Sequence, residues 1–142
     1  MCKIIAVANQ KGGVGKTTTT VNLAACIAEL GYRVLVVDFD PQANATSALG
    51  IDPRSVEKSM YDVILNDVNM RDCIIESQWE FLSVAPSNLD LAGAEIELVS
   101  AFNRERLLDG AISSVISEYD FVLIDCPPSI GLLTVNALTA AS

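Results

Sequence analysis

The segment most able to do chemistry is a glycine-rich run, Gln10-Lys11-Gly12-Gly13-Val14-Gly15-Lys16-Thr17-Thr18. Glycines let the backbone curl until several N–H groups point at one anion, and a helix that starts at the end of the run adds its positive dipole. In such a loop Lys16 reaches the β and γ phosphates of a nucleotide, and the Thr17 hydroxyl is a ligand of Mg²⁺. The run therefore predicts a phosphate-binding loop, although Gln10 stands where the usual pattern begins with glycine. A plain glycine-rich turn is the alternative, and it does not explain Gly-Lys-Thr at the start of a helix.

Two acidic segments follow apolar runs and are candidates to complete this site. Asp125 comes directly after residues 121–124, and a carboxylate at such a strand end can hold the hydration shell of Mg²⁺. Asp38 and Asp40 follow residues 33–37 in the same way. Because the chain contains no histidine, we expect a carboxylate to orient the water that attacks the γ phosphate, and either Asp38 or Asp40 suits that role. A turn after each strand is the alternative role for these acids.

The elements around these residues alternate between strands and helices. Apolar runs predict strands at residues 3–8, 33–37, 73–75, 81–84 and 121–124. Helical spacing predicts helices at residues 17–30, 43–49, 60–65, 91–98, 104–119 and 132–141. This order predicts an α/β fold with a doubly wound, mainly parallel sheet and helices on both faces. No linker divides the chain, so residues 1–142 are expected to form a single nucleotide-binding domain.

The composition limits the classes of protein to consider. Of the 142 residues 51% are apolar, and nine Lys and Arg face eighteen Asp and Glu, which gives a net charge of −9. Such a chain has no overall positive field for DNA or an anionic membrane, so a basic surface would have to lie elsewhere. Because no apolar run approaches the roughly 20 residues that span a bilayer, and the first residues do not resemble a signal peptide, a cytoplasmic protein is expected. The four cysteines form no CxxC pair, which favours free thiols over disulfides or a zinc site.

Three motifs together resemble one protein family. They are residues 8–18, the segment Asp38-Phe39-Asp40-Pro41-Gln42-Ala43-Asn44, and the segment Ile124-Asp125-Cys126-Pro127-Pro128-Ser129. In order and placement they are similar to the ParA/Soj partition ATPases, within a wider group with a deviant Walker A motif that includes the Min-type division-site ATPases. The resemblance covers essentially the whole chain. It implies the P-loop NTPase fold and the hydrolysis of ATP with Mg²⁺.

The resemblance also implies roles for single residues. Lys11 matches the signature lysine of the family, which reaches the partner's nucleotide across an ATP-dependent homodimer. Asp40 matches the water-orienting residue, Asp125 the Walker B acid, and Asp38 a supporting group near Mg²⁺. The expected catalytic residues are thus Lys11, Lys16 and Asp40, and the expected metal-binding residues are Thr17, Asp38 and Asp125. The expected nucleotide-binding residues are Lys11, Gly12, Gly13, Val14, Gly15, Lys16, Thr17 and Thr18.

The partners implied by the resemblance lie mostly outside this chain. Partition-type members bind DNA non-specifically through basic residues in their C-terminal part, and they act with a centromere-binding, ParB-like protein. Because the family is generally longer than 142 residues, the chain is expected to be an N-terminal portion of a protein truncated at its C-terminus. The DNA surface and the adenine-contacting segment are then expected beyond Ser142. A cytoplasmic, nucleoid-associated protein without a membrane partner is implied.

Three alternative functions remain open. A Min-type membrane-cycling ATPase would need an amphipathic C-terminal helix, whereas residues 40–44 favour the partition type. A relative of the nitrogenase iron protein would bridge an iron–sulfur cluster with cysteines, of which Cys126 is the suggestive one. A nucleotide-binding scaffold without turnover would carry the same motifs, and measured turnover separates it from an ATPase.

Overall fold

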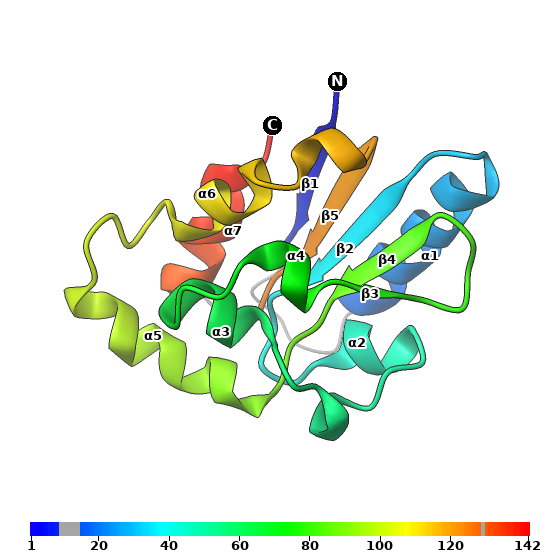
Figure 1. Ribbon diagram of the computed structural model, residues 1–142. Coiled ribbons are helices and arrows are strands. Elements are labelled where there is room, and N and C mark those ends of the chain that lie inside the picture. Colours follow the sequence, from blue (N-terminus) through cyan, green and yellow to red (C-terminus); the bar gives the residue numbers. More distant parts are fainter. Residues whose placement is uncertain (9–14, 129) are drawn as a thin grey trace.

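The described residues of the computed structural model, 1–8, 15–128 and 130–142, form a five-stranded central sheet in the order β1-β5-β2-β4-β3 (Figure 1). The strands are β1 (Lys3–Val7), β2 (Val34–Asp38), β3 (Ile75–Glu76), β4 (Leu82–Ala85) and β5 (Phe121–Asp125). Neighbouring strands pair parallel except β3, which is antiparallel to β4. The sheet is therefore mainly parallel, as the sequence predicts.

Strands β2 and β5 lie inside the sheet and are apolar along almost their whole length. Every residue of β2 is buried, and so are the last four residues of β5. Continuous runs of Val, Leu and Ile suit strands with helices on both faces, because neither side meets water. Both strands end in an aspartate, and the register pairs Asp38 with Asp125. Two of the candidate acids are thus neighbours at the carboxyl edge of the sheet.

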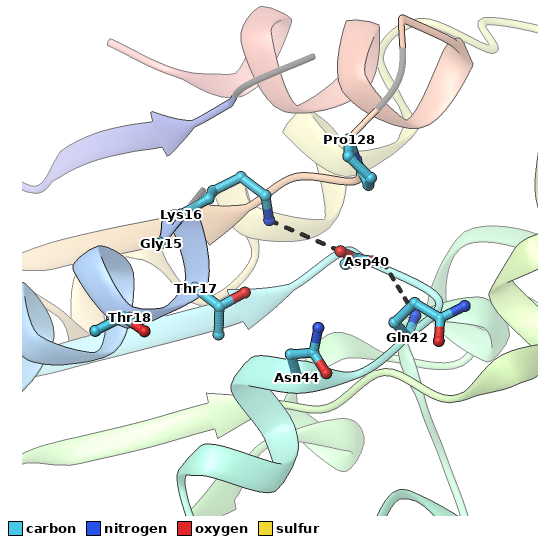
Figure 2. Close-up of a pocket in the computed structure, with 8 residues that line it drawn as sticks. All are labelled: Gly15, Lys16, Thr17, Thr18, Asp40, Gln42, Asn44 and Pro128. Atoms are coloured by element: carbon cyan, nitrogen blue, oxygen red, sulfur yellow. Dashed lines mark hydrogen bonds and ion pairs between the residues drawn. The ribbon is translucent and has the colours of Figure 1, made fainter. Parts of the chain in front are cut away.

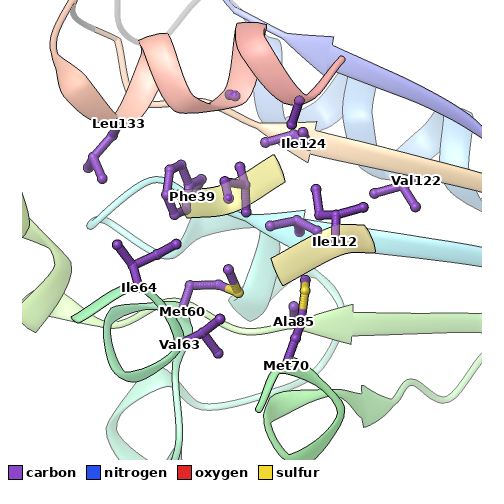
Figure 3. Packing of buried hydrophobic residues seen from close by; sticks show 14 of the residues in the cluster. Phe39, Met60, Val63, Ile64, Met70, Ala85, Ile112, Val122, Ile124 and Leu133 are labelled. Carbon is purple, nitrogen blue, oxygen red and sulfur yellow. The ribbon is translucent and has the colours of Figure 1, made fainter. Parts of the chain in front are cut away.

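Helices cover both faces of the sheet. Helices α1 (Lys16–Glu29) and α2 (Asn44–Ala48) pack on one face, against Val34 and Val36 of β2. On the other face, against Leu35 and Val37, lie α3 (Met60–Leu65), α4 (Met70–Cys73), α5 (Ala94–Glu97), α6 (Leu107–Ser113) and α7 (Leu132–Ala140). Figure 3 shows side chains of this layer, among them Met60 of α3, Ile112 of α6 and Leu133 of α7. Successive side chains of a strand point to opposite faces, so the apolar run of β2 serves both layers. This arrangement confirms the predicted doubly wound fold.

The predicted strand at residues 73–75 is wrong at its start. Cys73 is the last residue of α4, and only Ile75–Glu76 pairs with β4. The Asn69 side chain accepts a hydrogen bond from the Arg71 N–H and so caps the first turn of α4. Met70 and Cys73, three positions apart, then both face the core, which is helical rather than strand spacing.

Two predicted helices are shorter or broken in the structure. Residues 91–98 are divided among a 3₁₀ helix at Leu89–Gly93, α5, and a second 3₁₀ helix at Leu98–Ser100. Residues 104–119 contain only α6 and a 3₁₀ helix at Ile116–Glu118. The Ser114 hydroxyl donates to the Ala111 carbonyl at the end of α6, and such local bonds compete with continued helix. A further 3₁₀ turn, Pro53–Ser55, follows α2.

The described part of the chain contains no helix long and apolar enough to cross a membrane. The prediction of free thiols is confirmed for Cys2, Cys26, Cys73 and Cys126. Within residues 1–8, 15–128 and 130–142, no three His, Cys, Asp or Glu side chains gather in a metal-binding group.

Candidate active site

A cavity of about 450 Å³ opens at the carboxyl edge of the sheet, beside the ends of β2 and β5 and the start of α1 (Figure 2). Its lining residues come from three segments that are far apart in the sequence. They are Gly15, Lys16, Thr17, Thr18, Asp40, Gln42, Asn44 and Pro128. Ligands of open α/β sheets bind outside this same edge, where the loops after the strands converge.

Helix α1 begins at this cavity, and no side chain among the described residues caps its N-terminus. Its N-cap residue is Gly15, which has a φ of 78° and no side chain to accept from the first-turn N–H groups. Other residues adopt that left-handed conformation at a cost, which explains glycine here. The first turn carries no acidic residue that could take the place of a ligand. The start of α1 is therefore suited to an anion, because the N–H groups of a first helical turn and the helix dipole both favour negative charge.

Lys16 faces two carboxylates across the cavity. Its Nζ lies 2.5 Å from Asp125 Oδ1 and 3.7 Å from Asp40 Oδ2. The side chains of Lys16, Asp40 and Asp125 are only 8%, 6% and 0% exposed. Among the described residues, one ammonium group therefore faces two buried carboxyl groups, which leaves the centre short of positive charge. A polyphosphate entering this site needs an added cation as a counter-charge.

The residues present fit a magnesium ion. The Thr17 hydroxyl donates to Asp125 Oδ2 at 2.9 Å, so a hydroxyl and a carboxylate oxygen lie side by side. Mg²⁺ prefers such oxygen ligands at roughly 2.0–2.1 Å in octahedral geometry, in which neighbouring ligands are about 3 Å apart. Thr17 and Asp125 are thus the residues that would hold the ion, directly or through its water ligands.

Asp38 has a different environment from Asp125. Asp38 Oδ2 accepts from the Thr46 N–H at 2.8 Å and from the Thr46 hydroxyl at 2.6 Å, while Oδ1 accepts from the Asp40 N–H at 3.2 Å. Burial raises the pKa of Asp38 to about 7, against the hydrogen bonds from Thr46, which lower it. Both carboxylate oxygens of Asp38 thus already accept hydrogen bonds within the chain. The role of Asp38 near Mg²⁺ stays a prediction.

Asp40 is the acid of its segment that lines the cavity (Figure 2). Its Oδ1 accepts from the Gln42 N–H at 3.0 Å, and its Oδ2 faces Lys16. The sequence left the choice between Asp38 and Asp40 open. The geometry favours Asp40 as the group that meets a water molecule in the cavity.

Apart from Asp38, the predicted site residues divide into two sets. The cavity is lined by Gly15, Lys16, Thr17, Thr18 and Asp40. Asp125 does not line it but contacts Lys16, which does. The predicted residues Lys11, Gly12, Gly13 and Val14 lie outside the described residues.

Sequence reasoning assigned no role to three residues that line the cavity, Gln42, Asn44 and Pro128. All three stand within a few residues of Asp40 or Asp125, just after a strand end. That position is the signal that points to them, since loops after the strands carry ligand contacts in α/β sheets.

The model of the family described as AAA domain (AAA_31) matches residues 2–142 of this chain. Over 141 residues the chain is 57% identical to the sporulation initiation inhibitor protein Soj of Bacillus subtilis, covering 99% of the chain and 56% of Soj. The chain belongs to the ParA/Soj-type ATPases. It is also 50% identical to the chromosome partitioning protein ParA of Myxococcus xanthus, over 98% of the chain and 49% of that protein. The family resemblance predicted from the three motifs is thereby confirmed.

Solved structures extend the comparison of this ParA/Soj-type chain to three dimensions. A protein from Mycobacterium smegmatis described as cobyrinic acid a,c-diamide synthase, with bound ADP and magnesium, superposes with a TM-score of 0.96 at 45% identity. The match covers 99% of this chain and 57% of the other. The predicted P-loop NTPase fold is confirmed, and the chain spans about half the length of the curated relatives it matches.

Proposed function

We propose that this ParA/Soj-type domain binds ATP with Mg²⁺ and, in its full-length protein, hydrolyses ATP to ADP and phosphate during DNA partition. One observation carries the proposal. A lysine, a threonine hydroxyl and two carboxylates converge on the uncapped start of α1. The nucleotides named for solved relatives and the partition function named for curated ones support it.

The charges of the site suggest how the chain's own residues act. The Lys16 ammonium moves from Asp125 and Asp40 to the β and γ phosphates, where it offsets the charge of the transferring group. Thr17 and Asp125, freed of that lysine, hold the magnesium ion, which neutralises phosphate charge when bound. Asp40 accepts a hydrogen bond from the attacking water and aligns it with the γ phosphate.

The finer parts of the proposal rest on the family. Two ATP-bound subunits form a dimer in which Lys11 reaches the partner's nucleotide, so that positive charge arrives only when subunits meet. A ParB-like protein and non-specific DNA are the proposed partners. Because this chain has a net charge of −9, the DNA contacts are assigned to residues outside it. A cytoplasmic protein on the nucleoid follows from these partners.

The test is a pair of aspartate-to-asparagine variants in the full-length protein. Asp40→Asn should bind ATP and Mg²⁺ normally and hydrolyse ATP about 100-fold more slowly, since the amide oxygen lacks the negative charge that draws the proton of the attacking water. Asp72→Asn changes an exposed acid of α4 in the same way and should turn over normally. Fluorescent-nucleotide binding and phosphate release measure the two quantities. Normal turnover in Asp40→Asn would move the water-orienting role to another residue.

These assays, together with a vesicle-binding assay, separate the alternatives. Wild-type ATP binding with no turnover, with or without DNA and partner protein, identifies a scaffold. Hydrolysis that requires added cobyrinic acid identifies a synthase of the kind named for the Mycobacterium smegmatis protein. ATP-dependent binding to anionic vesicles identifies a Min-type cycle. Cys126 is a poor candidate for the ligand of a cluster shared between subunits, because it is completely buried in the core of this chain.

A further inference from the structure

The main chain of Asp40 is held at both of its polar groups. Its N–H donates to Asp38 Oδ1 at 3.2 Å, and its carbonyl accepts from the Ser87 hydroxyl at 2.7 Å. The same carbonyl also accepts from the Ala43 N–H at 2.9 Å. The backbone of Asp40 therefore has no freedom to rotate without breaking hydrogen bonds that are shielded from water.

Thr46 completes a ring of hydrogen bonds with these residues. Its hydroxyl donates to Asp38 Oδ2 at 2.6 Å and accepts from the Ser87 N–H at 3.0 Å. The ring thus runs from Asp40 to Asp38, Thr46, Ser87 and back to Asp40, and we call these four residues the Asp40 ring. Asp38, Thr46 and Ser87 are completely buried, and Asp40 is 4% exposed.

The Asp40 ring joins parts of the chain that are distant in sequence. Asp38 ends β2, Thr46 lies in α2, and Ser87 follows β4. Helix α2 has no cap of its own, because its N-cap residue, Ala43, carries no polar side chain and has a φ of 58°. Asp38 supplies the missing acceptor for the Thr46 N–H from eight residues earlier in the chain. The turn that carries Asp40 is thereby fixed to the sheet, to α2 and to the β4 segment at once.

We propose that Thr46 and Ser87 are positioning residues that hold Asp40, through the Asp40 ring, in the place where its carboxylate meets the attacking water. The inference rests on the proposed ATPase function. Neither residue lines the cavity, so they act on Asp40 and not on the nucleotide. A shift of about 1 Å in a reacting group can cost about 100-fold in rate, which makes such a clamp consequential.

The alternative is that the ring only stabilises the fold, and a set of four variants distinguishes the two roles. Thr46→Val removes the hydroxyl at nearly constant volume, and Thr46→Ser restores it. Ser87→Ala removes the bond to the Asp40 carbonyl, and it keeps the test available if Thr46→Val does not fold. Ser59→Ala is the matched control, because it removes a buried hydroxyl that caps α3, away from the cavity.

The measurements use the full-length protein and begin with single-turnover hydrolysis and ATP affinity. Thr46→Val and Ser87→Ala should hydrolyse ATP about 10- to 100-fold more slowly with unchanged affinity, and Thr46→Ser should turn over almost normally. Ser59→Ala should lose stability and keep its rate. Folded Thr46→Val and Ser87→Ala variants with wild-type rates would overturn the inference, as would an equal loss of rate in Ser59→Ala.

A second readout does not depend on turnover. In the nucleotide-free protein, amide hydrogen exchange at Asp40 and Gln42 should be faster in Thr46→Val and Ser87→Ala than in wild type and Ser59→Ala. If the wild type binds ATP without hydrolysing it, the proposed function fails while the exchange rates still decide whether the ring holds Asp40. Unchanged exchange at Asp40 in both variants would overturn the positioning role.

Discussion

The ends of β2 and β5 lie side by side at the same edge of the sheet, yet their aspartates have different hydrogen-bond partners. Asp38 and Asp125 are register partners on neighbouring parallel strands, and both are completely buried. Asp125 contacts Lys16 and Thr17 at the start of α1, whereas Asp38 contacts Thr46 and the Asp40 N–H. The role of a strand-end acid is therefore decided by the elements that pack beside it and not by its place in the strand.

The largest effect is expected when the cation that contacts both Asp40 and Asp125 is removed. Lys16→Ala deletes the charge that faces Asp125 and Asp40 and that would meet the β and γ phosphates. ATP affinity, measured with a fluorescent analogue, should fall at least about 100-fold, equivalent to about 2.7 kcal/mol. Lys58→Ala, at an exposed lysine, is the control and should bind normally. ATP affinity that survives in Lys16→Ala would remove α1 as the phosphate site.

A direct test of the comparison exchanges each strand-end acid for its amide. Asp125→Asn should raise the Mg²⁺ concentration that ATP binding requires by about 10- to 100-fold, because Asp125 lies beside the Thr17 hydroxyl. Asp38→Asn should leave that dependence nearly unchanged, since its oxygens are turned to Thr46 and Asp40. Magnesium titrations of ATP binding measure both. Equal losses in the two variants would mean that Asp38 also supports the ion, as the family resemblance implies.

A smaller effect concerns stability and pH. The pKa of Asp38 is raised from 3.8 to about 7, mainly because burial disfavours its charged form. Between those values the folded chain keeps a proton that the unfolded chain has released, so the free energy of unfolding should fall as pH rises from about 4 to about 7. The contribution is at most about 1.4 kcal/mol per pH unit. Asp38→Asn should flatten this slope in nucleotide-free denaturation experiments, while Asp72→Asn should not. Parallel slopes in wild type and Asp38→Asn would contradict the buried-acid interpretation.

The smallest effect is expected for the acid just before β5. Hydrogen bonds from Arg33 hold the pKa of Asp120 below its usual range, but both side chains are well exposed, at 37% and 51%. Water and salt weaken such pairs, so Asp120→Asn should lower the melting temperature by only about 2 °C at neutral pH. A carboxyl group whose pKa is lowered by folding stabilises the folded state above its unfolded pKa, and this stabilisation is lost as the pH falls through its folded pKa. The difference in melting temperature between wild type and Asp120→Asn should therefore vanish at low pH. A large loss of stability would show that the Arg33–Asp120 pair contributes more than an exposed ion pair does.

Local patterns were enough to predict much of the fold and part of the site. The continuous apolar runs of β2 and β5 predicted strands with helices on both faces, because such runs have nowhere to meet water. Their terminal acids were predicted to face one ligand edge, which is a consequence of parallel pairing. The helix breaks were not predicted, since the serine hydroxyls that end α6 bond to carbonyls that periodicity ignores.

The sequence by itself determined the features that depend on neighbours along the chain. These are the alternation of strands and helices, the phosphate-binding pattern at Lys16 and Thr17, and the acids at the strand ends. The tertiary structure alone decided which acid turns to the cavity and which is held by other residues. Ser87 lies 41 residues from Thr46 and 47 from Asp40, yet it hydrogen-bonds to both. Hydrogen bonds of that span form only after the sheet has brought β2 and β4 together, and no local spacing encodes their direction.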